Sequence, residues 1–224
     1  MNLGVLFSGG KDSTLAMLKA SEFHKISCLI TLVSENKESY MFQTPNIHIT
    51  SLQAEALGLP HIIVDTKGEK EKELADLKKA LAEAKAQHKI DGIVTGAVRS
   101  TYQASRIQRI CHELDLWCFN PLWLKDQLEL LKDVLKSGIV AMISGVFAEP
   151  LDREFLGKQL DKKMAHKLEE AEKTHGINPA GEGGEIETTV LYAPGFKKKI
   201  LVKKTSVRYA DFAGTCHIVE AELR

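Results

Sequence analysis

The 224-residue chain lacks paired cysteines, an excess of either charge and any long apolar run, and each absence excludes a class of protein. Its four cysteines are scattered without a C-x-x-C pair, which argues against zinc, iron–sulfur and thiol-redox chemistry. Because 30 basic residues balance 30 acidic ones, we expect no stable binding to nucleic acid. Neither a secretory signal nor a membrane span is visible, so we expect a cytoplasmic protein without membrane contact.

The most informative stretch is Ser8-Gly9-Gly10-Lys11-Asp12-Ser13, between an apolar strand-like run at 3–7 and a helical pattern at 13–23. In a strand-turn-helix, two glycines let the backbone approach an anion, and the first helical N–H groups point at it. We therefore predict a phosphate site, in which lysine adds charge, the serines donate hydrogen bonds and Asp12 holds a magnesium ion. A Walker A loop is excluded, because Val5 stands where its first glycine should be.

This hexapeptide, in its strand-turn-helix context, resembles the pyrophosphate loop (PP-loop) of the N-type ATP pyrophosphatases. Members of that superfamily use ATP to adenylate a carbonyl or amide oxygen. The resemblance implies ATP and Mg²⁺ as the bound species, and Lys11 and Asp12 as catalytic residues.

Strands and helices alternate over the first two thirds of the chain. Short apolar runs at 25–34, 61–65, 91–95 and 116–119 follow the first strand, with helical patterns between them. This order predicts an α/β fold with a doubly wound, parallel, five-stranded sheet, and the run at 138–146 reads as one more buried strand of the same kind.

The pattern changes near residue 149. Helical stretches at 151–156 and 161–175 precede strand-like runs at 189–192, 199–203 and 216–223. We therefore predict a nucleotide-binding domain at 1–148 and a smaller substrate-binding α+β domain of antiparallel character at 149–224.

Ligands of a doubly wound sheet lie beyond the carboxyl ends of its strands. The backbone of Leu32 and Val33 could therefore read the adenine edge, and Gly96 allows close approach of the nucleotide. Ser100 or Thr101 can cap the following helix, on which Tyr102 and Arg106 share a face. Together with Ser100, these two side chains could hold phosphate or a substrate carboxylate. A capped helix with an exposed arginine is the alternative.

Two further segments could contact the substrate. The polar segment 34–44 contains Ser39, Tyr40 and Gln43, and either it binds a ligand or its aromatic residues anchor a surface loop. The stretch 180–188 places three glutamates among glycines. Glutamates suit a nucleotide site only if a metal or a cationic substrate lies between them and the phosphates.

Taken together, SGGKDS, SENKESYMFQT, GAVRSTYQASRIQR with the PLW corner, and GEGGEIET resemble the diphthine–ammonia ligase family over essentially the whole chain. The resemblance implies a fold of the adenine nucleotide alpha hydrolase (HUP) type. It also implies amidation of diphthine on elongation factor 2 with ammonium, through an acyl-adenylate, giving diphthamide, AMP and pyrophosphate. Glu182, Glu185 and Glu187 then suit the trimethylammonium group of diphthine or the incoming ammonium.

On this reading Glu182 and Glu185 join the catalytic residues, and the substrate-binding residues are Ser39, Tyr40, Gln43, Gly183, Gly184, Glu187 and Thr188. Gln43 stands where the family pattern leads us to expect histidine, so a proton-transfer role there is in doubt. Two alternatives stay open: a tRNA-modifying enzyme of the same superfamily, and a nucleotide-binding sensor without turnover. A homodimer also stays open.

Overall fold

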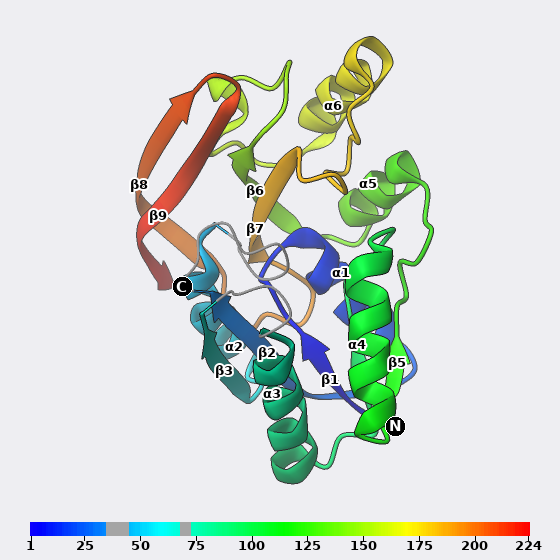
Figure 1. The fold of residues 1–224 in the computed structure, drawn as a ribbon. Coiled ribbons are helices and arrows are strands. Elements are labelled where there is room, and N and C mark those ends of the chain that lie inside the picture. The colour runs from blue at the N-terminus through cyan, green and yellow to red at the C-terminus, as the bar shows by residue number, and fades with distance from the viewer. Residues whose placement is uncertain (35–44, 68–72) are drawn as a thin grey trace.

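The computed structural model describes residues 1–34, 45–67 and 73–224, and its first sheet is parallel (Figure 1). The strands are β1 (Asn2–Leu6), β2 (Lys25–Ser34), β3 (His61–Thr66), β4 (Gly92–Val94) and β5 (Trp117–Phe119), in the order β3-β2-β1-β4-β5. The predicted doubly wound, five-stranded sheet is confirmed. Its strand order reverses between β1 and β4, so the segments that leave these two strands meet at the position where such sheets bind ligands.

Helices cover both faces of this sheet. One face carries α1 (Lys11–Ser21), a short 3₁₀ turn (η1, Ile47–Ile49) and α2 (Thr50–Leu57), whereas the other carries α3 (Glu73–His88) and α4 (Thr101–Glu113). The Ser100 hydroxyl accepts the Gln103 N–H at 3.4 Å, so of the two candidates it is Ser100, and not Thr101, that caps α4. Within the described ranges, no helix combines the length and apolar character that crossing a lipid bilayer requires.

A second, antiparallel sheet follows. It contains β6 (Val140–Val146), β7 (Ile186–Tyr192), β8 (Ile200–Ala210) and β9 (Ala213–Leu223), in the order β7-β6-β9-β8. The prediction that 138–146 joins the parallel sheet is wrong, because β6 is a central strand of this second sheet. A strand buried on both faces gives the same continuous apolar run in either kind of sheet, so the pattern could not separate them. The proposed boundary at residue 148 stays a prediction.

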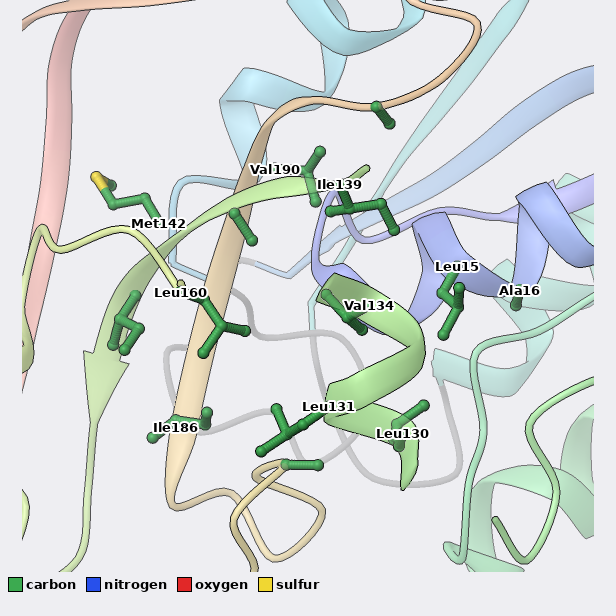
Figure 2. Packing of buried hydrophobic residues seen from close by; sticks show 14 of the residues in the cluster. Leu15, Ala16, Leu130, Leu131, Val134, Ile139, Met142, Leu160, Ile186 and Val190 are labelled. Atoms are coloured by element: carbon green, nitrogen blue, oxygen red, sulfur yellow. The ribbon is translucent and has the colours of Figure 1, made fainter. Parts of the chain in front are cut away.

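The two sheets share one hydrophobic core. The helix α5 (Gln127–Lys136) lies between α1 and the strands β6 and β7, as Figure 2 shows. On one side Leu130 and Val134 face Leu15 of α1, and on the other Leu131 faces Ile186 of β7. Between β6 and β7 in the chain, a 3₁₀ turn (η2, Arg153–Phe155) precedes α6 (Lys162–His175). The Asp161 side chain caps α6 by accepting the Met164 N–H. This shared core fixes β7 beside the loop that follows β1.

Candidate active site

The loop between β1 and α1 has a tightly defined backbone. Gly9 adopts a φ of +76°, a conformation that favours glycine, and Gly10 is the N-cap of α1. The Ser8 and Ser13 hydroxyl oxygens lie 3.2 Å apart, and the Ser13 hydroxyl also lies 3.2 Å from the Gly10 carbonyl. The helix begins at Lys11, two residues earlier than its apolar pattern suggests, so Lys11 and Asp12 lie in its first turn.

Hydrogen bonds from β7 and α2 hold this loop in place. The Gly9 carbonyl accepts the Val190 N–H at 2.9 Å and the Gln53 side-chain amide, also at 2.9 Å. The same Gln53 amide nitrogen donates to the Val190 carbonyl at 2.7 Å. The Lys11 N–H donates to the Thr188 hydroxyl at 3.1 Å. Thr188 is buried and helps to hold the loop, and its predicted contact with substrate stays a prediction. Gln53 carried no recognisable signal in the sequence.

Lys11 and Asp12 form an ion pair at the mouth of the loop. The Lys11 ammonium lies 2.7 Å from Asp12 Oδ2, with the lysine side chain 4% exposed and the aspartate 32% exposed. The other carboxylate oxygen, Asp12 Oδ1, is buried and has no hydrogen-bond partner among the described residues. A buried carboxylate oxygen is costly to leave unpaired, and it suits a hydrated Mg²⁺ ion. Because the described residues contain no group of three or more potential metal-binding side chains, phosphate oxygens and water would have to supply the remaining ligands.

Gly96, which follows β4, lies directly against the first turn of α1. A Cβ added there would come within 2.7 Å of the Ser13 backbone nitrogen. A side chain at this position would therefore cover the N-terminal end of the helix, where backbone N–H groups are available to an anion. The absence of a side chain here fits the predicted close approach of a nucleotide phosphate.

The acidic stretch brings two glutamates to this site. Glu182 accepts the Arg99 N–H at 2.8 Å and also bonds the backbone of Ser100. Burial raises the pKa of Glu182, and these two N–H groups partly oppose the shift. Glu187 lies on β7, next to the loop-bound Thr188. Burial raises its pKa to about 7, with Lys11 lowering and Asp12 raising the value.

Glu185 has a different environment from these two glutamates. Its Oε1 accepts the backbone and side-chain N–H groups of Asn178 at 3.0 and 2.7 Å, and its Oε2 accepts the Gly183 N–H at 2.8 Å. These bonds close the glycine-rich turn, which Gly184 continues with a φ of +87°. The structure thus places the Glu185 carboxylate in the turn rather than beside Lys11. A catalytic role for Glu185, and substrate binding by Gly183 and Gly184, stay predictions.

The remaining candidates lie around the rim. The Ile30 carbonyl of β2 accepts the Phe7 N–H, just past the end of β1. Leu32 lies two residues further along β2, so its backbone N–H and C=O point in the same direction as those of Ile30, to a position beyond the last residue of β1. Val33 directs its own groups toward β3. On α4 the Arg106 guanidinium stacks over the Tyr102 ring at 3.6 Å. The predicted contacts at Ser39, Tyr40 and Gln43 lie outside the described residues.

This arrangement combines an anion site with carboxylates. Ser8, Gly96 and the first turn of α1 suit the phosphates of a nucleotide, while Glu182 and Glu187 are acidic groups close enough to Lys11 and Asp12 to interact with them electrostatically. Such a site can hold a nucleotide phosphate next to a cationic or proton-donating second substrate.

Comparison with known families assigns both halves of the chain. A model of the diphthamide synthase N-terminal domain matches residues 1–117, and a model of the diphthamide synthase C-terminal domain matches residues 126–223.

Individual relatives agree with these models. A protein of Homo sapiens named diphthine–ammonia ligase is 37% identical over 230 residues, which cover 92% of this chain and 85% of that protein. A Schizosaccharomyces pombe protein of the same name is 33% identical over 230 residues, covering 95% of this chain and 38% of that longer protein. A solved structure from Methanocaldococcus jannaschii, described as a predicted subunit of tRNA methyltransferase, matches with a TM-score of 0.42 and 18% identity over 87% of this chain and 98% of its own.

Proposed function

The chain belongs to the diphthamide synthase family, and from this membership we propose that it amidates the diphthine side chain of elongation factor 2 with ammonium, using ATP and releasing AMP and pyrophosphate. Its relatives over most of its length are named diphthine–ammonia ligases, which makes it an ATP-dependent ligase. The protein substrate, the adenylate intermediate, the magnesium ion and a cytoplasmic location are parts of the proposal.

The observation that supports it best is the direct attachment of the loop to β7. The Lys11 N–H bonds Thr188, and the preceding residue of the same strand is Glu187. The N-terminal end of α1 and a partly buried carboxylate are thus held next to each other by one strand. That juxtaposition suits a reaction in which a nucleotide phosphate meets a substrate carrying a positive charge.

The chemistry explains why both parts are needed. A carboxylate is a poor acyl donor, because its oxygen is a poor leaving group. Attack of the diphthine carboxylate on the α-phosphorus forms an acyl–AMP anhydride and releases pyrophosphate, and ammonia then displaces AMP at the acyl carbon. Lys11 and the N-terminal N–H groups of α1 would stabilise the charge that grows on pyrophosphate as it leaves. A Mg²⁺ ion held by Asp12 and the phosphates would add to that stabilisation.

Ammonium must lose a proton before it can attack. Burial raises the pKa of both Glu182 and Glu187, and it raises that of Glu187 to about 7, so Glu187 can accept a proton near neutral pH. We propose that one of them takes this proton while the other contacts the substrate.

An isotope experiment tests the proposal. Elongation factor 2 bearing diphthine with ¹⁸O in its carboxylate is incubated with ATP, magnesium and ammonium, and the nucleotide product is examined by mass spectrometry. We expect AMP containing one ¹⁸O atom, formed only when all components are present. Formation of ADP and phosphate, or AMP without the label, would rule out the adenylate.

A further inference from the structure

Phe147, the residue after β6, has an aromatic ring that remains 44% exposed although a large apolar core lies nearby. Its backbone N–H bonds the Glu185 carbonyl at 2.9 Å, so the end of β6 is fixed to the start of β7. The ring lies back over Gly145, two residues earlier on the same face of the strand. The backbone of Phe147 is therefore fixed, and its aromatic ring remains partly exposed to solvent.

Glu187 is the direct partner of Gly145 across the sheet. Directly paired residues of antiparallel strands project to the same face, so Glu187, Gly145 and Phe147 share one face. A Cβ added at Gly145 would lie 2.6 Å from Cε2 of the Phe147 ring and 3.0 Å from Cβ of Glu187. The ring and the glutamate side chain thus flank the place that a side chain at Gly145 would fill.

The local charge favours a cation at this place. The Lys11 ammonium is already paired with Asp12 at 2.7 Å, whereas Glu187 adds an acidic group directly opposite Gly145. A quaternary ammonium ion cannot donate hydrogen bonds. Proteins recognise it by the faces of aromatic rings together with nearby negative charge.

We propose that Phe147 and Glu187, over Gly145, form a subsite for a quaternary ammonium group. This inference rests on the proposed function, because diphthine carries a trimethylammonium group on the carbon atom next to the carboxylate that is amidated. The ring contacts the methyl groups, and the carboxylate of Glu187 balances the charge. Phe147 is then a specificity-determining residue that distinguishes the methylated side chain from its unmethylated form.

Steady-state kinetics of the full-length protein test the subsite. In Phe147→Leu we expect KM for diphthine-bearing elongation factor 2 to rise about 10- to 30-fold, the loss typical of a desolvated cation–π contact. KM for ATP should stay unchanged, and Phe147→Trp should restore the low KM for the protein substrate. With a substrate whose amine is unmethylated, wild type and Phe147→Leu should have similar KM values.

Two further variants separate binding from structure. Gly145→Ala keeps the ring but places a methyl group against it, and we expect it to raise KM for the protein substrate as Phe147→Leu does. Phe23→Leu, an 80% exposed phenylalanine just beyond α1, serves as the matched control and should leave KM unchanged. A fall in thermal stability with equal KM changes for methylated and unmethylated substrates would show that Phe147 is only structural and would overturn the proposal.

A binding measurement distinguishes failure of the subsite from failure of the proposed function. Tetramethylammonium chloride is titrated against the wild type and Phe147→Leu, with NMR shifts as the readout. Phe147-dependent binding without amidation would reject the function and retain the subsite. Amidation of diphthine with an unchanged KM in Phe147→Leu would reject the subsite alone.

Discussion

Replacing Glu187 by glutamine should stabilise the protein above neutral pH and change its stability much less at pH 5. The reason is the burial that raises the pKa of this carboxyl group to about 7. In the unfolded chain the pKa of the group lies near its ordinary value of 4.5. Glutamine has nearly the same shape but no charge to bury.

The sign and size follow from proton linkage. Between the two pKa values the folded protein keeps the proton that the unfolded chain has lost, so stability falls as pH rises through this window. Below pH 4.5 both states are protonated, and above about pH 7 the penalty is complete. A shift of this size corresponds to about 3 kcal/mol, or about 2 kcal/mol after allowing for the partial exposure of the side chain.

Urea denaturation of the nucleotide-free protein measures this effect. We expect the free energy of unfolding of Glu187→Gln to exceed that of the wild type by less than about 1 kcal/mol at pH 5 and by about 2 kcal/mol or more at pH 8. The exposed Glu55, on α2, gives a control in Glu55→Gln, which should show no such pH dependence. An equal difference for Glu187→Gln at both pH values would refute the reasoning.

Three other substitutions test the loop and its supports. Asp12→Asn removes the charge that would hold Mg²⁺, so we expect AMP formation to fall at least about 100-fold. It keeps a hydrogen-bonding partner for Lys11, so the melting temperature should change little, and a large loss of stability would show that the carboxylate is needed for folding. Gln53→Leu leaves two buried carbonyl groups, on Gly9 and Val190, without its amide donor, so urea denaturation should show a loss of about 2–4 kcal/mol and calorimetry a weaker affinity for ATP. Gly96→Ala should weaken binding of a non-hydrolysable ATP analogue at least about 10-fold by calorimetry, since its methyl group would press on the first turn of α1, and unchanged affinity would contradict that geometry.

The sequence was most informative where local chemistry decides the structure. The glycine pair before Lys11 predicts a strand-turn-helix without reference to anything distant, and Ser100 predicts a helix cap in the same way; both are present. The parallel sheet was also predictable, because its strands are short, apolar and separated by helices.

What escaped prediction depends on contacts between residues far apart in the chain. Gln53 reads as an ordinary residue of a short helix, and only the fold places it beneath Gly9 and beside Val190. The apolar run of β6 could not disclose which sheet it would join. Likewise, three glutamates within six residues look equivalent in sequence. In the structure the glycine-rich turn binds the carboxylate of Glu185, whereas Glu182 and Glu187 interact with Lys11 and Asp12.

The hydrogen bonds from β7 to the loop have a consequence for attempts to dissect the protein. A fragment ending at residue 148 would contain every residue of the hexapeptide, yet it would lack Val190, which bonds Gly9, and Thr188, which bonds Lys11. It would also expose the side of α5 that normally packs on Ile186. The hexapeptide is therefore not an independent module. Grafting it with only its own strand and helix into another scaffold would transfer the sequence without the hydrogen bonds that hold its backbone in place.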